Sequence, residues 1–132
     1  MEYTVKARST KNKKFLEAIM PSMLRQLGLT NSRKSVFIIV EKCDTEGATY
    51  PVDLLDSYIV VIKPGKLKDI GLTLAHEMVH VRQMAKGILK TVNGTNYWKG
   101  KRYTKRTKYL DMPWEKDAFA KQEIIFRRAI DE

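Results

Sequence analysis

The only two histidines of the chain, His76 and His80, stand four positions apart, and a glutamate, Glu77, follows the first of them. In an α-helix, residues four apart lie one above the other on the same face, so both imidazoles can bind one metal ion. Zinc accepts nitrogen ligands tetrahedrally and keeps a coordination position for water, from which Glu77 can take a proton. This HExxH spacing predicts a metal centre with a general base. The alternative is a pair of core histidines that hydrogen-bond locally.

A third ligand must be a carboxylate, because catalytic zinc sites usually have three protein ligands and the sequence has no further histidine. On a helical wheel, Glu115 and Gln122 fall near the middle of the apolar arc of the last helix. That arc consists of Trp114, Ala118, Phe119, Ile125, Phe126 and Ala129. A carboxylate that faces a core is costly unless it is paired or binds metal, so Glu115 is the predicted third ligand of one zinc ion per chain.

Glu115 and Gln122 each have a second interpretation. Glu115 follows Pro113 closely enough to interact with the dipole of its own helix. Gln122 is a candidate to orient a metal ligand, and equally a buried glutamine satisfied by backbone groups.

The elements before the HExxH segment follow from hydrophobic spacing. Helical periodicity predicts a helix over residues 12–27, which Pro21 kinks or breaks and Gly28 ends. Branched side chains predict strands over residues 36–40 and 58–62. Residues 49–55 form a third strand at a sheet edge or an irregular stretch, because Pro51 lacks the N–H that a central strand donates.

The second half of the chain contains two further helices. Residues 67–86 are apolar on most sides, which indicates a helix packed on more than one face, with Gly87 at its end. Residues 88–110 are predicted to form a loop or irregular hairpin. The last helix covers residues 113–130, with a proline at its first position. With no repeat or linker in the sequence, we expect one α+β domain over residues 1–132.

The charge of the chain favours polyanionic partners. Lysine and arginine number 25 against 15 acids, which gives a formal net charge of +10. Six basic residues cluster in KGKRYTKRTK near Trp98 and two tyrosines: Lys99, Lys101, Arg102, Lys105, Arg106 and Lys108. Basic residues mixed with aromatics are typical of surfaces that contact phosphates and stack bases. The alternative is a solvated basic hairpin.

The cellular compartment is predicted from the cysteine count and from the apolar segments of the sequence. Cys43 is the sole cysteine, which excludes an intrachain disulfide and favours a reducing compartment. The N-terminal residues are charged but are not followed by an apolar stretch, and no segment is apolar enough for a membrane span. We therefore expect a soluble cytoplasmic protein without a membrane partner, in the host cytoplasm if the gene is a phage gene.

Two segments resemble a known family. LAHEMVHVRQ, followed after some thirty residues by PWEKDAF, resembles small zincin-like proteins of the gluzincin type found in phage and bacterial genomes, and more distantly the SprT-like zincins. The resemblance covers about residues 57–126. It implies a minimal zincin-like metallopeptidase fold: an N-terminal helix, a small twisted sheet, an active-site helix and a C-terminal ligand-bearing helix.

The resemblance also implies roles for single residues. His76, His80 and Glu115 match the zinc ligands of the family, and Glu77 matches its catalytic glutamate, so the implied activity is hydrolysis of peptide bonds in a peptide or protein substrate. Strand 58–62 is the implied edge that pairs with a bound peptide. One position departs from the larger gluzincins, which have an aspartate where this chain has Phe119.

Several roles stay open at this point. Asp111, Asp117 and Gln83, besides Gln122, are candidates to orient a ligand. Oxyanion donors come from Tyr97, Tyr103 or Tyr109, unless these rings only pack. Two other functions compete with peptidase activity: a basic, nucleic-acid-associated zinc protein, with or without SprT-like proteolysis, and a zinc-binding module without hydrolytic activity.

Overall fold

The computed structural model describes residues 1–104 and 106–132, so the predicted nucleic-acid contact Lys105 lies outside the described residues. The described elements form a mixed α+β fold, as predicted. They are β1 (Glu2–Lys6), α1 (Thr10–Gln26), β2 (Ser35–Val40), β3 (Gly47–Val52), β4 (Ser57–Ile62), α2 (Leu67–Ala85), β5 (Leu89–Val92), β6 (Thr95–Trp98), β7 (Lys101–Tyr103) and α3 (Pro113–Asp131), with short 3₁₀ turns η1 (Asp53–Leu55) and η2 (Tyr109–Asp111). None of the helices in these ranges has the length and apolar character that a bilayer crossing requires.

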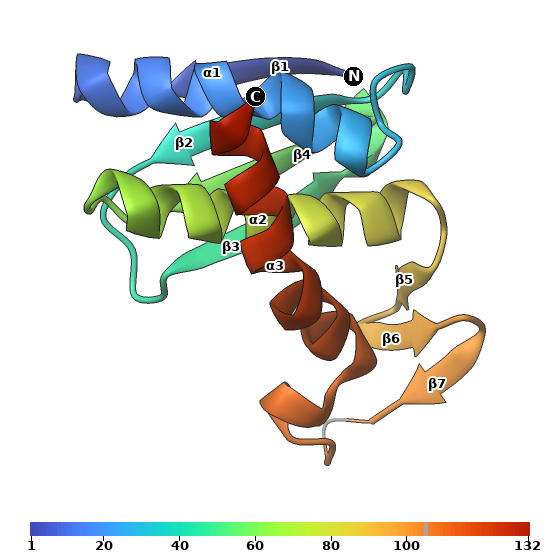
Figure 1. The fold of residues 1–132 in the computed structure, drawn as a ribbon. Helices are drawn as coiled ribbons and strands as arrows, with labels where there is room; N and C mark the ends of the chain where they lie inside the picture. Colours follow the sequence, from blue (N-terminus) through green and yellow to red (C-terminus); the bar gives the residue numbers. More distant parts are fainter. Residues whose placement is uncertain (105) are drawn as a thin grey trace.

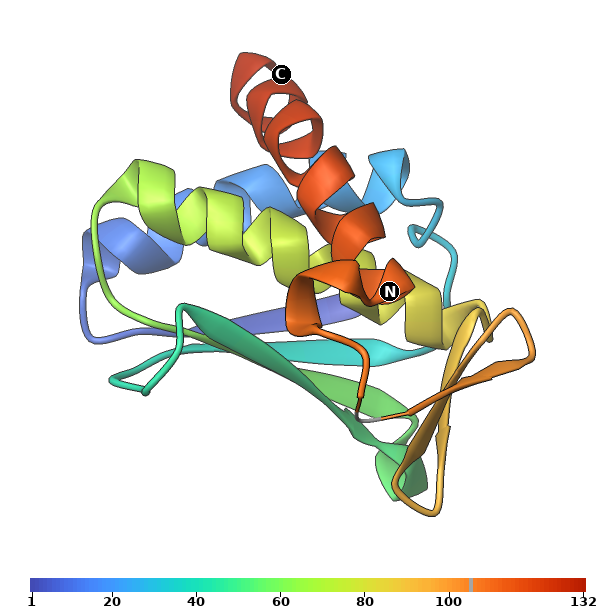
Figure 2. The same ribbon diagram turned by 90° about the horizontal axis from the view of Figure 1, so that it is seen from below.

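The main sheet has the strand order β1-β2-β4-β3, in which β3 alone runs antiparallel to its neighbour. All three helices lie on one face of this sheet (Figure 2). Alternate residues of β2 and β4 point into the core below the helices: Val36, Ile38, Val40, Tyr58, Val60 and Ile62. The expectation that residues 58–62 provide a free edge is wrong, since β4 pairs with β2 on one side and β3 on the other. The edge strand next to α2 is β3.

Helix α1 runs through Pro21 without the break that was one of the two predicted outcomes, a kink being the other. A proline cannot donate to the carbonyl four residues before it, which here belongs to Glu17. The hydroxyl of Tyr3 donates to that carbonyl at 3.5 Å. Tyr3 lies on β1, a strand that hydrophobic spacing did not predict, and β1 therefore supplies a partner that the helix itself lacks. Gly28 follows the helix with a φ of 68°, in line with its predicted role as a stop.

Helix α2 is apolar on most sides because it packs between the sheet and α3. Helix α3 lies across α2 and reaches α1 with its C-terminal half (Figure 1). At the crossing, Gly71 of α2 receives the ring of Phe126, and any side chain at position 71 would collide with that ring. The close approach of the two helices brings the first turn of α3 over the HExxH segment.

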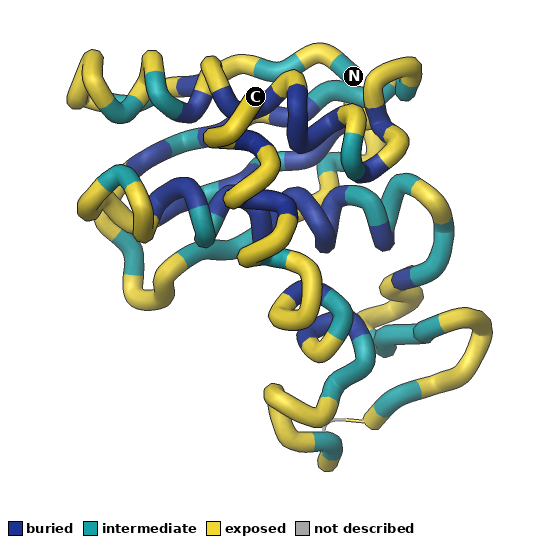
Figure 3. Tube along the Cα trace, in the orientation of Figure 1, coloured by how far each residue is buried: buried dark blue, intermediate teal, exposed yellow. Residues whose placement is uncertain are grey.

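Residues 89–103 form a regular three-stranded antiparallel sheet in place of the expected loop or irregular hairpin. Its two tight turns, Asn93-Gly94 and Lys99-Gly100, have positive φ at both residues, which matches the twist of antiparallel strands. This β5–β7 sheet extends beyond the end of α2 (Figure 1), and its surface is mostly exposed or half-buried (Figure 3).

Candidate metal centre

Three buried side chains from two helices meet at one point. His76 and His80 extend from α2, and Glu115 extends from the first turn of α3. The Nε2 atoms of His76 and His80 lie 2.9 and 3.1 Å from the same oxygen, Glu115 Oε1. The potential ligand atoms all lie within 4.8 Å of one another, and each residue is 7% exposed. These side chains lie close enough together to bind a metal ion.

His80 is oriented by a glutamine one turn further along α2. Gln83 Oε1 lies 2.9 Å from His80 Nδ1. The orientation of this amide is fixed by its nitrogen, which donates to the carbonyl of Trp114 and to Asp117 Oδ2, each at 2.9 Å. Because an amide oxygen can only accept, Nδ1 of His80 carries the proton.

His76 is held in the same way, with its Nδ1 2.7 Å from Gln122 Oε1. When both Nδ1 atoms are protonated, neutral imidazoles direct their Nε2 lone pairs at the carboxylate of Glu115. Three acceptors that converge in a buried space need a cation or additional protons between them. A divalent ion that accepts nitrogen and oxygen ligands satisfies all three, so the donor set fits a metal such as zinc.

The charges in the cluster depend on one another. Burial opposes ionisation of Glu115, but hydrogen bonds from His76 and His80 outweigh it and lower the pKa of Glu115 to about 2. Burial also opposes protonation of His80, yet its hydrogen bonds to Glu115 and Gln83 prevail and raise its pKa. Protons and a metal ion therefore compete for the same Nε2 atoms, and acid weakens metal binding.

Glu77 lies beside the histidines on α2 and is 5% exposed. Its carboxylate accepts a 2.8 Å hydrogen bond from Thr49 Oγ1 of the edge strand β3. Burial raises the pKa of Glu77 and outweighs the opposite effects of His80, Thr49 and His76. A carboxylate with a raised pKa is a stronger base than an exposed one and can accept and return a proton more readily. The contact with Thr49 was not predicted, because it joins residues 28 positions apart on different elements.

No family model, curated protein or solved structure matches this chain. What the centre does must therefore be inferred from its side chains and from the cavity beside it. That cavity has a volume of about 420 Å³, and His76 and Glu77 line it. Its other lining residues are Thr45, Glu46, Gly47, Leu72, Thr73, Tyr109, Phe119 and Gln122. A molecule in this cavity would contact both a ligand and the candidate base.

Of the three tyrosines considered as oxyanion donors, the structure brings Tyr109 to the centre. Its hydroxyl donates to Glu115 Oε1 at 3.1 Å. Burial and the charge of Glu115 raise the pKa of Tyr109 to about 12, so the hydroxyl keeps its proton. The ring of Tyr103 packs edge-on against Trp114 instead, with centroids 5.7 Å apart. Tyr97 lines a separate groove of the β5–β7 sheet.

The remaining candidates for ligand orientation lie at different distances from the centre. Asp117 contacts Gln83 rather than an imidazole, and it also pairs with Lys121 at 2.7 Å. Asp111 is exposed in η2. The ring of Phe119 lies edge-on to the ring of His76, with centroids 4.6 Å apart. An aromatic contact thus occupies the position where the larger gluzincins have an aspartate.

The predicted nucleic-acid contacts within the described residues lie on or after the β5–β7 sheet. Lys99 Nζ lies 5.9 Å from the centroid of the Trp98 ring, and Lys101 Nζ lies 5.4 Å from that of Tyr103. The others, Arg102, Arg106 and Lys108, are exposed.

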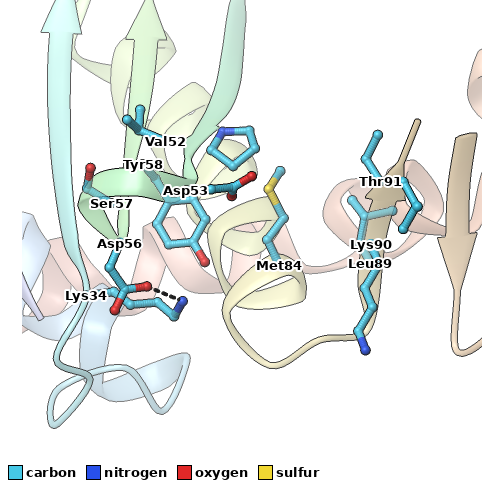
Figure 4. Close-up of a pocket in the computed structure, with 12 residues that line it drawn as sticks. Lys34, Val52, Asp53, Asp56, Ser57, Tyr58, Met84, Leu89, Lys90 and Thr91 are labelled. Atoms are coloured by element: carbon cyan, nitrogen blue, oxygen red, sulfur yellow. Dashed lines mark hydrogen bonds and ion pairs between the residues drawn. The ribbon is translucent and has the colours of Figure 1, made fainter. Parts of the chain in front are cut away.

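A second cavity, of about 330 Å³, lies between the start of β4 and strand β5 (Figure 4). The ion pair of Lys34 and Asp56, 2.7 Å long, lies at its wall. Its lining among residues 1–104 and 106–132 includes none of the residues of the metal centre, so this cavity is not the space beside the catalytic candidates.

Proposed function

We propose that the protein is a zinc-dependent metallopeptidase of the zincin-like type. The observation that carries the proposal is the meeting of His76, His80 and Glu115 beside a buried Glu77 that lines a cavity. Each of the four residues belongs to one of the two segments that resemble gluzincins. A main sheet, an HExxH helix and a later helix with the third ligand follow one another in the order that the resemblance implies.

The ligands proposed for the zinc ion are His76 Nε2, His80 Nε2 and Glu115 Oε1. When bound, zinc would act as a Lewis acid towards a substrate carbonyl and a water molecule. Glu77 would accept the proton of the attacking water and then donate it to the leaving amine, a double role that suits its raised pKa. Tyr109 retains its proton and would exchange its hydrogen bond to Glu115 Oε1 for one to the developing oxyanion.

The edge strand supports a peptide substrate. β3 pairs with β4 on one side, and its residues Gly47 and Thr49 lie next to Glu77. The unpaired side of an edge strand offers backbone N–H and C=O groups to an extended peptide. A peptide paired there would lie along the cavity that contains Glu77.

The test is metal content and proteolysis of protein purified without chelators. We expect about one zinc ion per chain and cleavage of an unstructured protein such as casein. Glu77→Gln should keep the zinc and abolish cleavage, whereas His80→Ala should lose both. Glu46→Gln is the matched control, because it removes an acid from the same cavity without touching the proposed proton transfer. Cleavage that persists in Glu77→Gln would refute the mechanism.

A further inference from the structure

The positive charge of the chain is concentrated in one segment. Residues 78–110 contain nine lysines and arginines and no acid. The remaining 99 residues contain 16 basic and 15 acidic residues, so they are almost neutral. Nearly the whole net charge therefore lies on the end of α2, the β5–β7 sheet and the turn after it. Such an asymmetry creates a local field that attracts a polyanion to this sheet.

The two faces of the β5–β7 sheet differ in what they contact. Leu89, Trp98 and Tyr103 share one face; Leu89 is buried there and Tyr103 packs on Trp114 of α3. This face is attached to the rest of the molecule. Thr91, Asn96 and Lys101 also belong to this attached face, and the opposite face carries Lys90, Val92, Thr95, Tyr97 and Arg102.

A row of three side chains crosses that opposite, outer face. Lys90 of β5 is in register with Tyr97 of β6, which is in register with Arg102 of β7. Lys90 and Arg102 are exposed and Tyr97 is half-buried. With strands about 4.8 Å apart, the row spans roughly 10 Å, with one aromatic ring between two cations.

A groove lies beside this row. It has a volume of about 250 Å³, and its walls include Lys90, Val92 and Tyr97. Ile88, Gly87 and Gly100 complete the lining, and the two glycines have no side chain to block a flat ligand. A groove with an aromatic wall and flanking cations suits a planar base with a phosphate on each side.

We propose that the outer face of the β5–β7 sheet binds single-stranded nucleic acid, with Tyr97 stacking on a base and with Lys90 and Arg102 contacting the neighbouring phosphates. A single strand is favoured over a duplex because stacking on Tyr97 needs an exposed base face, which a duplex hides. Binding at this face does not depend on hydrolysis at the metal centre.

The experiment measures fluorescence anisotropy with labelled oligonucleotides. We expect dT20 and U20 to bind with an affinity that falls as salt rises, and a 20-base-pair duplex to bind more weakly. Tyr97→Leu removes the aromatic face and should weaken dT20 binding about 5- to 150-fold, while Tyr97→Phe keeps the ring and the affinity.

Charge contacts are tested separately with the double variant Lys90→Ala/Arg102→Ala. Loss of two phosphate contacts should reduce the slope of log K against log salt by about 1.4 for a single strand. Lys6→Ala/Lys42→Ala is the matched control: both residues are exposed and outside the segment 78–110, so the same change in net charge should leave the slope as it was. If circular dichroism shows that Tyr97→Leu does not fold, the salt slope of Lys90→Ala/Arg102→Ala tests the proposal in its place.

Four outcomes overturn the proposal. Folded Tyr97→Leu binds dT20 as tightly as the unmodified protein does, or the duplex binds more tightly than dT20. Alternatively, the salt slope of Lys90→Ala/Arg102→Ala is unchanged, or heparin or phosphatidylserine vesicles bind as tightly as dT20. The last result would show attraction by charge alone.

Discussion

Replacing Gln83 by methionine tests the proposed orientation of the metal ligands. Methionine has a similar size, so the change removes hydrogen bonds with little change in volume. Gln83 is fully buried, and three hydrogen bonds of 2.9 Å depend on it, to His80, Trp114 and Asp117. Asp117 keeps its ion pair with Lys121. The carbonyl of Trp114 loses this donor but still belongs to the hydrogen-bonded turn of α3, so the group left without a partner is the Nδ1–H of His80. Because the space is buried and methionine fills it, water does not replace the glutamine.

The size of the effect follows from this isolated donor. A buried donor without a partner costs about 1–3 kcal/mol of stability. Loss of the group that orients a metal-bound histidine lowers metal affinity about 10- to 100-fold. Gln122→Met is the matched comparison, since Gln122 orients His76 but is half-exposed, so that water can take its place. We expect the weaker effect from Gln122→Met.

Two assays measure these effects. Competition with a chromophoric chelator gives the zinc affinity, and urea denaturation in the presence of EDTA gives the stability of the metal-free protein. A folded Gln83→Met variant that binds zinc as tightly as the unmodified protein would refute the reasoning. It would show that the contact between Gln83 and His80 does not fix the tautomer that presents Nε2 to the metal.

Three further predictions concern α2, α3 and the edge strand β3. Thr49→Val removes a hydrogen bond that lowers the pKa of Glu77, so the acid limb of the kcat/KM profile should move to higher pH with the zinc content unchanged; a limb that stays in place would exclude Glu77 as the titrating base. The pKa of Glu115 falls from 4.5 to about 2 on folding, so in the metal-free protein its stabilisation is complete above about pH 4.5 and is lost towards pH 2. Urea denaturation across this range should show a smaller pH dependence in Glu115→Gln, and an identical one would contradict the assignment. Gly71→Ala places a methyl group against the ring of Phe126 and should lower the stability by about 1–2 kcal/mol, since overpacking exceeds the gain in helix propensity; unchanged urea denaturation would show that the helices separate without cost.

Local patterns predicted most of the elements because their signals lie within a few residues. Helix 67–86 and its end at Gly87 follow from apolar spacing and a glycine, and α2 ends within one residue of that prediction. The first hairpin of the β5–β7 sheet could also have been predicted, since Asn93-Gly94 is a strong hairpin signal. The dense basic residues that follow favoured a loop instead. Strand β1 was not readable: it has a single buried residue, Val5, and pairs with Ile38, more than thirty positions away.

The residues of the metal centre also differ in how far local sequence predicts them. The two histidines and Glu77 share one helix, so their proximity is set by helical geometry alone. Glu115 was predicted from the apolar arc, which records the packing of α3 on α2. Thr49 could not be predicted, because its contact with Glu77 depends on how β3 registers with β4 and on where α2 crosses the sheet. Such contacts are fixed by tertiary packing and leave no pattern in the local sequence.

The use of glutamines to orient both histidines has an electrostatic consequence for the proposed enzyme. A carboxylate in their place would add a negative charge beside the imidazoles and would raise the pKa of the nearby Glu77 further. Neutral amides fix the Nδ1 protons without that charge. With a divalent ion, one ligand carboxylate and Glu77 ionised, the formal charges of the buried centre cancel. Glu77 can then stay ionised near neutral pH in spite of its burial, which is the state that a general base requires.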